Sequence, residues 1–211
     1  MKEEIHVSTL TSLHIPMVSK GHTNGQKIMI VMHGLGDSLD SYRPLAKEIN
    51  VTGLHYLLVN APRPYFFGHS WYDIPPGNPR DGIDESVKTL QRTISELNDQ
   101  GFKNEDIFLL GFSQGGCIAM ETLYSLKEPL AGIVALSPRL YLEKLPSSIN
   151  KTPIFMAHGK ADEAINFNET FSNMNEIKKL NSDLEFHAYD YGHTFDIDTI
   201  MDLRVWLNNH L

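Results

Sequence analysis

Gly111-Phe112-Ser113-Gln114-Gly115 is the most informative segment of the chain, because a strand pattern leads into it and a helical pattern leads out of it. The run Ile107-Phe108-Leu109-Leu110 is typical of a strand buried on both faces, and we expect Gly111 to end it. A sharp strand-to-helix turn crowds the backbone, so the positions flanking Ser113 require glycine. Such a turn holds the serine hydroxyl where a base can reach it. The alternative interpretation is a glycine-rich packing turn with an incidental serine.

Short apolar runs and helical patterns alternate along the rest of the chain. Strands are predicted at residues 27–32, 54–59, 107–110, 131–136, 153–157 and 184–189. Helices are predicted at residues 83–97, 114–126, 167–177 and 196–208. We expect two short antiparallel strands within residues 4–18 and a long functional loop over residues 61–80. The alternation predicts an α/β fold with a mostly parallel central sheet and helices on both faces.

Length and composition indicate a globular protein with one domain over residues 1–211. Apolar residues make up 41% of the chain and charged residues 21%, which is ordinary for a globular domain. The only cysteine, Cys117, excludes an internal disulfide. It falls inside the predicted helix after Ser113, where we expect a buried, small hydrophobic side chain.

The charge pattern excludes several classes of partner. The chain carries 18 basic and 26 acidic residues, a formal charge of −8, and no run of Lys and Arg that would suit a nucleic acid. No stretch approaches the roughly 20 apolar residues of a membrane span, and the polar segment 1–6 does not lead into a signal sequence. We expect no nucleic-acid partner, no stable membrane insertion and a cytoplasmic location. The oligomeric state stays open, with a homodimer among the options.

A serine at such a turn needs a base, and His193 is the predicted one. Enzymes built around this turn place their partners in the order serine, acid, histidine. Four histidines follow Ser113, at positions 158, 187, 193 and 210. His210 is next to the last residue, His187 lies inside a strand pattern, and His158 precedes the best acid. His193 follows the last predicted strand and precedes the last predicted helix, which is where the base belongs.

Asp162 is the predicted acid. It follows the strand that ends at Ala157, and loops at the carboxyl ends of strands carry the sites of α/β sheets. Its carboxylate would fix the tautomer of His193 and stabilise the imidazolium form. Glu163 is the immediate alternative, and Asp190, three residues before His193, is another.

Residues 33–38, His33-Gly34-Leu35-Gly36-Asp37-Ser38, follow the first long apolar run. We expect the backbone N–H of Gln114 to be one donor to a developing oxyanion, and that of Leu35 to be the second. A tight turn with a helix N-cap is the alternative interpretation, and both can hold at once. The segment lacks the lysine of a phosphate-binding loop.

Taken together, these motifs resemble the acyl-protein thioesterase and carboxylesterase group of α/β-hydrolases, also called the phospholipase/carboxylesterase family. The matching segments are His33-Gly34-Leu35-Gly36-Asp37-Ser38, Trp71-Tyr72-Asp73, Gly111-Phe112-Ser113-Gln114-Gly115-Gly116, His158-Gly159-x-x-Asp162 and Gly192-His193. The chain departs from the family pattern after the acid, where Glu163-Ala164-Ile165 stands in place of a proline and small apolar residues.

The resemblance implies the α/β-hydrolase fold without a large lid domain, and no metal or organic cofactor. It implies a triad of Ser113, Asp162 and His193, with Leu35 and Gln114 as oxyanion donors. The expected substrates are small-molecule or acyl-protein carboxylic esters and thioesters with short to medium acyl chains, hydrolysed through an acyl-enzyme. A lysophospholipase-like lipid hydrolase, or a non-catalytic binding module on the same scaffold, is the alternative.

Residues 61–75 are dense in aromatic side chains, which either pack this loop down or line an apolar pocket. We expect Phe66 and Phe67 to contact the acyl chain. Trp71 is expected to border the same channel, with a partly structural role.

Overall fold

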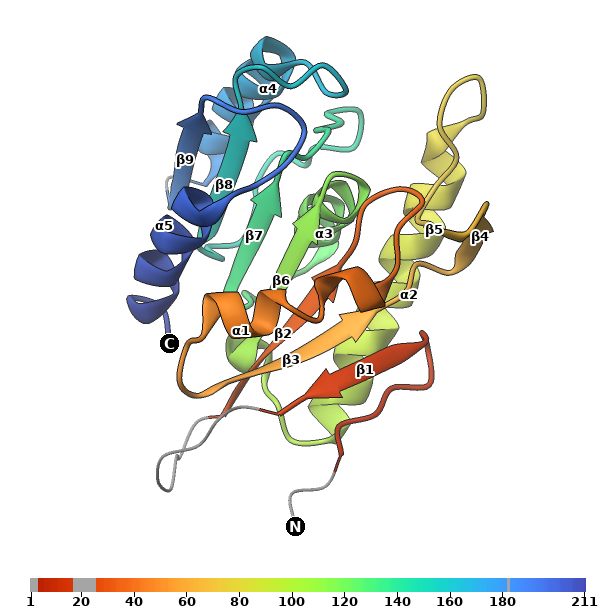
Figure 1. Ribbon diagram of the computed structural model, residues 1–211, viewed down its shortest axis with the longest axis vertical. Coiled ribbons are helices and arrows are strands. Elements are labelled where there is room, and N and C mark those ends of the chain that lie inside the picture. The colour runs from red at the N-terminus through yellow and green to blue at the C-terminus, as the bar shows by residue number, and fades with distance from the viewer. Residues whose placement is uncertain (1–3, 17–25, 182) are drawn as a thin grey trace.

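The computed structural model describes residues 4–16, 26–181 and 183–211. The central sheet has seven strands, and helices pack against it (Figure 1). From one edge to the other the strands are β1 (Ser12–Ile15), β3 (Leu54–Val59), β2 (Lys27–Met32), β6 (Ile107–Phe112), β7 (Gly132–Leu136), β8 (Ile154–Gly159) and β9 (Leu184–Tyr189). Within this sheet, as the described residues form it, β1 is antiparallel to β3 and the other neighbouring strands are parallel, so the mostly parallel sheet predicted from the sequence is confirmed.

Two of the predictions about strands are wrong: the number of strands near residues 4–18, and the end of the strand before Ser113. Within the described part of residues 4–18 there is one strand, β1, instead of two, and residues 17 and 18 lie outside the described residues. Gly111 does not end its strand, because β6 continues to Phe112. The continuation has a physical reason: Gly111 pairs with Met32 on one side and with Ala135 on the other, so the ladder holds up to the residue before Ser113.

The helices cover both faces of the sheet. They are α1 (Leu45–Ile49), α2 (Pro79–Asp99), α3 (Gln114–Ser125), α4 (Phe167–Leu180) and α5 (Ile197–Asn208), with short 3₁₀ turns η1 (Leu39–Tyr42) and η2 (Asn104–Asp106). Buried side chains of α1 and α5 share one apolar cluster with one face of the sheet, and those of α2, α3 and α4 share another cluster with the opposite face. The sequence did not predict α1, which is a single turn of five residues.

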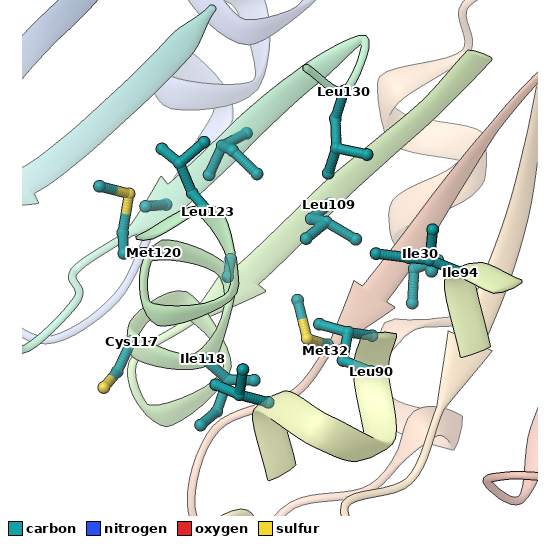
Figure 2. Packing of buried hydrophobic residues seen from close by; sticks show 14 of the residues in the cluster. Ile30, Met32, Leu90, Ile94, Leu109, Cys117, Ile118, Met120, Leu123 and Leu130 are labelled. Carbon is teal, nitrogen blue, oxygen red and sulfur yellow. The ribbon is translucent and has the colours of Figure 1, made fainter. Parts of the chain in front are cut away.

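The larger cluster fills the space between the sheet and the pair α2 and α3. Figure 2 shows Ile30 and Leu109 on the strands facing Leu90 and Ile94 of α2 and Ile118 of α3. All five side chains are buried, and burial of apolar surface is the main term that stabilises such a layer.

Cys117 belongs to the same cluster, as its position in the helix predicted. Its side chain is buried, and it projects from α3 in Figure 2. Burial raises the pKa of the Cys117 thiol well above its usual range, so it stays protonated and unreactive.

The segment 61–80 contains secondary structure in place of the long loop that was predicted. Two three-residue strands, β4 (Arg63–Tyr65) and β5 (Gly68–Ser70), form an antiparallel hairpin. The hairpin is tied to the loop after β2, because the Gly36 N–H donates to the His69 carbonyl (2.8 Å) and the His69 N–H donates to the Asp37 carbonyl (2.9 Å). Alternation over three residues is too short to be recognised in a sequence as a strand.

Among the helices of the described ranges, none has both the length and the apolar character that crossing a membrane requires.

Candidate active site

Ser113 sits at the turn between β6 and α3, in a strained backbone conformation with φ 53° and ψ −113°. A positive φ is costly for a residue with a Cβ, and the surrounding packing enforces it here. A Cβ on Gly111 would lie on the backbone of Gly115, and a Cβ on Gly115 would lie on the carbonyl oxygen of Met32. The expected need for glycine on both sides of the serine is therefore confirmed as a steric requirement.

Three loops at the carboxyl ends of the strands bring Ser113, His193 and Asp162 together. The Ser113 Oγ lies 2.9 Å from the His193 Nε2. The His193 Nδ1 lies 2.7 Å from the Asp162 Oδ2. The three groups thus form one continuous chain of hydrogen bonds across 80 residues of sequence. Ser113 and His193 are partly exposed and the Asp162 side chain is buried, so the chain runs from the surface inward.

The second oxygen of Asp162 is held by the backbone. Its Oδ1 accepts hydrogen bonds from the N–H groups of Ala164 (2.9 Å) and Ile165 (2.8 Å). Burial opposes ionisation of this carboxyl, but the hydrogen bonds from His193 and from the two backbone N–H groups outweigh it, so the pKa of Asp162 lies below its usual value. The carboxylate is therefore fixed in position and charged at neutral pH.

The two alternative acids lie elsewhere. Glu163 is exposed. Asp190 is also exposed and pairs with Lys160 at the surface, at 2.7 Å. Of the three acids, it is Asp162 that the structure places at hydrogen-bond distance from His193.

His158 is a further neighbour of Asp162, and the sequence reasoning assigned it no role at the site. Its side chain is fully buried, with Nε2 3.2 Å from the Asp162 Oδ2 and 3.1 Å from the Ile165 carbonyl oxygen. Both neighbours accept hydrogen bonds, so Nε2 carries the proton. Burial lowers the pKa of His158 although the Ile165 carbonyl and Asp162 oppose this shift, so the ring is neutral. The i, i+4 spacing of this histidine and the acid was the only signal of the contact in the sequence.

Leu35 and Gln114 lie on the two backbone segments that border Ser113. Gln114 is the first residue of α3, and the first N–H groups of a helix have no acceptor within the helix. In the loop after β2, the N–H groups of Gly36 and Asp37 are occupied by the carbonyls of His69 and Gly34. Within the described ranges the Leu35 N–H has no such bond. Their role as oxyanion donors stays a prediction, and both groups are free to fill it.

The side chain of Gln114 has a second, structural task that the sequence did not reveal. Its Oε1 accepts hydrogen bonds from the Trp71 N–H (3.0 Å) and from the Ser70 hydroxyl (3.2 Å). Its Nε2 donates to the Tyr72 carbonyl (2.8 Å). This buried amide therefore fastens the segment after β5 to the turn that carries Ser113.

Trp71 is fully buried, so its side chain offers no surface to a substrate. Its ring N–H donates to the His33 carbonyl at 2.9 Å. The structure thus favours the structural part of its expected role: Trp71 positions the start of the 33–38 loop. Phe66 and Phe67 lie between β4 and β5 with exposed fractions of 88% and 108%, and their contact with an acyl chain stays a prediction.

The side chain of His33 adds further hydrogen bonds beside the contact between its carbonyl and Trp71. Its Nε2 accepts the N–H of Ala61 at 3.0 Å, and its Nδ1 donates to the Gly34 carbonyl at 2.6 Å. Burial lowers the pKa of His33, although the Gly34 carbonyl opposes the shift. A neutral ring with the proton on Nδ1 is the form that fits both contacts.

Within the described ranges, no three His, Cys, Asp or Glu side chains are grouped so that they could hold a metal ion. The groups around the Ser113 hydroxyl are the His193 imidazole, the fixed Asp162 carboxylate behind that imidazole, and the backbone N–H groups of Leu35 and Gln114. This set of groups can carry out acyl transfer to serine.

Comparison with known proteins supports the same chemistry. The family model of the phospholipase/carboxylesterases matches residues 13–211. An acyl-protein thioesterase 1 from Yarrowia lipolytica is 32% identical, over 87% of this chain and 91% of the relative. The carboxylesterase SOBER1 from Arabidopsis thaliana is 26% identical, over 85% of this chain and 89% of the relative.

A solved structure similar to this chain is that of esterase PE8, with a TM-score of 0.86 and 25% identity over 96% of this chain and 99% of the esterase. The expected α/β-hydrolase fold is confirmed by this likeness. The expected lack of a large lid is confirmed as well, because within the described ranges no insertion forms a separate layer over the sheet.

Proposed function

The chain belongs to the phospholipase/carboxylesterase family of α/β-hydrolases, and we propose from this premise that it hydrolyses carboxylic esters and thioesters of short to medium acyl chains through an acyl-enzyme on Ser113. The observation that carries the proposal is the unbroken chain of hydrogen bonds from the Ser113 hydroxyl through His193 to Asp162. A neutral serine is a weak nucleophile, and this arrangement is what activates it.

The reaction follows from the positions of the protons. His193 Nε2 accepts the hydroxyl proton while the Ser113 Oγ attacks the carbonyl carbon. The carbonyl oxygen becomes an oxyanion, which the backbone N–H groups of Leu35 and Gln114 stabilise, each worth roughly 3 kcal/mol. His193 then returns the proton to the leaving alcohol or thiol. In the second half, His193 activates a water molecule in the same way, and the acid is released.

Asp162 contributes by keeping His193 in one tautomer. Because the carboxylate accepts from Nδ1 at 2.7 Å, the unprotonated nitrogen of the neutral ring is Nε2, which faces the serine. The charge of Asp162 also stabilises the imidazolium that forms during attack.

A covalent probe tests the proposal most directly. A fluorophosphonate should label the wild-type chain at Ser113 and should leave Ser113→Ala unlabelled, because only an activated serine reacts. The same two proteins should be compared on p-nitrophenyl esters of increasing acyl length and on a matching thioester. Absence of labelling and of hydrolysis in the wild type would favour the non-catalytic binding module.

A lysophospholipase-like activity has less support. The relatives described above are named as an acyl-protein thioesterase and a carboxylesterase, and the triad serves either type of substrate. The cytoplasmic location and the homodimer remain predictions, which cell fractionation and sedimentation would test.

A further inference from the structure

A cleft of about 340 Å³ lies beside His193, on the side of the active site that faces η1 and α1. Its walls include His193 itself and Phe112, the residue before the nucleophile, together with residues of η1 and α1. No residue of the β4–β5 hairpin lines it. In Figure 1 the hairpin lies at one side of the sheet, and the loop that leads into α5 lies at the other.

We propose that this cleft receives the leaving group of the substrate, and that it favours an alcohol or thiol that is apolar next to the scissile bond and positively charged farther out. The inference rests on the proposed function. The cleft would bind the leaving group of the substrate, whereas Phe66 and Phe67 are predicted to contact its acyl chain.

The direction of proton transfer places the leaving group on this side. His193 Nε2 takes the proton of Ser113 and must return it to the leaving oxygen or sulfur, which requires that atom within roughly 2.6–3.2 Å of the ring for oxygen. The leaving oxygen or sulfur therefore lies next to the His193 ring. The rest of the leaving group lies in the cleft, because His193 forms part of the wall of that cleft.

The floor of the cleft is apolar and aromatic. Tyr42 and Leu45 are buried side chains of η1 and α1. The ring of Phe112 stands edge-on to Phe195 with 5.5 Å between centroids, and lies 4.9 Å from the ring of His193. Such a floor binds the alkyl part of an alcohol or thiol through burial of apolar area. Aromatic rings also attract a cation that lies over their faces.

The charged groups of the cleft are of one sign. Asp37 and Glu48 both line it, and the residues described as lining it include no lysine or arginine. Asp37 is held in place because its Oδ1 accepts from the Ser41 hydroxyl at 2.5 Å. Glu48 is exposed. A cleft with one sign of charge concentrates the opposite charge, so a cationic leaving group is favoured over a neutral one of the same shape.

Two arginines near the cleft are bonded to other groups. Arg43 is paired with Asp40 at 2.6 Å. Arg204 donates to the backbone carbonyls of Glu48 and Ile49 and does not pair with the Glu48 carboxylate. Because Asp37 is half-buried and Glu48 is exposed, we expect an effect of the size of an exposed ion pair, roughly two- to fivefold in kcat/KM.

The test compares two butyrate esters of the same shape. Butyrylcholine, the butyrate ester of choline, carries a quaternary ammonium, and 3,3-dimethylbutyl butyrate has carbon in place of that nitrogen. The measured quantity is the ratio of their kcat/KM values for the wild type, Glu48→Gln, Glu48→Lys and, as a matched control, Glu176→Gln on α4, away from the cleft. The wild type and the control should prefer the choline ester, Glu48→Gln should lower the ratio, and Glu48→Lys should lower it further. High salt should shrink the preference.

A steric arm tests the location independently of charge. Ser41 lines the cleft and is exposed, so Ser41→Phe should narrow it. We expect a larger loss on 3,3-dimethylbutyl butyrate than on methyl butyrate, with the acyl-length dependence of methyl esters retained. Equal wild-type kcat/KM values on butyrylcholine and 3,3-dimethylbutyl butyrate would overturn the proposal. A ratio of these two values that Glu48→Lys leaves unchanged would overturn it as well. If neither ester is hydrolysed through Ser113, the proposed function fails instead.

Discussion

The turn around Ser113 and the β4–β5 hairpin flank the same loop, residues 33–38, but they are built in different ways. At the turn, backbone packs directly on backbone, and a single added Cβ at Gly111 or Gly115 would overlap main-chain atoms. The hairpin has a contact of the same kind at Gly68, where an added Cβ would overlap the Gly36 carbonyl oxygen. Beyond it the chain carries Phe66 and Phe67 almost entirely in solvent.

This difference separates chemistry from selectivity. The reacting groups must keep their geometry to a few tenths of an ångström, and a close-packed turn supplies that rigidity. The hairpin tip has few neighbours and can change its side chains without disturbing the turn. Substitutions at the turn and its partners should therefore change rates by orders of magnitude, whereas substitutions at the tip should change them a few-fold.

Removal of the proposed nucleophile or the proposed base should have the largest effect. Ser113→Ala should lower kcat by roughly 10⁴–10⁶-fold, and His193→Ala by about as much, because the triad acts as a unit. The measurement is hydrolysis of p-nitrophenyl butyrate, with thermal unfolding as the check that both variants fold. A Ser113→Ala enzyme that keeps a tenth of the wild-type activity contradicts the assignment.

Substitution of the proposed acid should give the next largest effect. Asp162→Asn should lower kcat by roughly 10³–10⁴-fold, because an amide in place of the carboxylate no longer fixes the proton on His193 Nδ1. Glu163→Gln is the matched control, since Glu163 is adjacent in sequence and exposed, and it should retain activity. The opposite ranking of the two variants would assign the acid to Glu163 and leave the mechanism standing.

Gln114 links the two regions, so its truncation tests whether they are coupled. Gln114→Ala would leave the buried Trp71 N–H without its acceptor, and the Tyr72 carbonyl would keep only the Ser70 hydroxyl as a donor. An unsatisfied buried polar group costs about 1–3 kcal/mol, which should appear as a loss of unfolding free energy in urea. Gln91→Ala is the control, because its amide bonds to Ser125 at the surface. Equal losses would mean that the Gln114 amide does not couple the turn to the hairpin.

His158 should reveal itself in the pH dependence of stability. Its pKa is lowered in the folded state by burial, so the unfolded chain binds more protons once the pH falls below about 6.5. The contribution of neutral His158 to the free energy of unfolding is therefore fully present above that pH. It is lost as the pH drops toward the lowered pKa of the folded state. Asp162, whose pKa is also lowered, contributes in a more acidic window.

We expect His158→Gln to lose less unfolding free energy than the wild type when the pH is lowered from 7.5 to 5. The measurement is urea unfolding at the two pH values. His6→Gln, at an exposed position, serves as the control and should keep the wild-type difference. An unchanged pH dependence in His158→Gln would show that the protonation of His158 does not limit stability there.

The turn also explains which parts of the site were predictable from sequence. Ser113, Asp162 and His193 follow from chain order and from the ends of strongly apolar strands, which are local signals. The contacts of Gln114 and His158 depend on side-chain directions set by tertiary packing, and one sequence carries no signal for them beyond spacing. The β4–β5 hairpin was missed because its strands have three residues each, and α1 because it has five.

The smallest effect is expected at the hairpin tip, where Phe66 and Phe67 are exposed and Phe66 rests edge-on against Tyr65, with 4.8 Å between centroids. Each methylene of an acyl chain that is buried against these rings contributes about 0.8 kcal/mol. The kcat/KM value should therefore rise a few-fold for each added carbon until the available apolar surface is covered. Phe66→Ala and Phe67→Ala should flatten this rise while changing acetate hydrolysis little, because an acetyl group is too short to reach the tip.

The chain-length series decides between a binding and a structural role for the tip. The measurement is kcat/KM on acetate, butyrate and octanoate p-nitrophenyl esters for the wild type and both variants. Phe171→Ala is the matched control, since Phe171 is a partly exposed aromatic residue on α4, and its series should follow the wild type. A scaffold role predicts parallel losses at all three chain lengths, because a displaced hairpin would disturb residues 33–38 whatever the acyl group. A contact role predicts a loss that grows from acetate to octanoate.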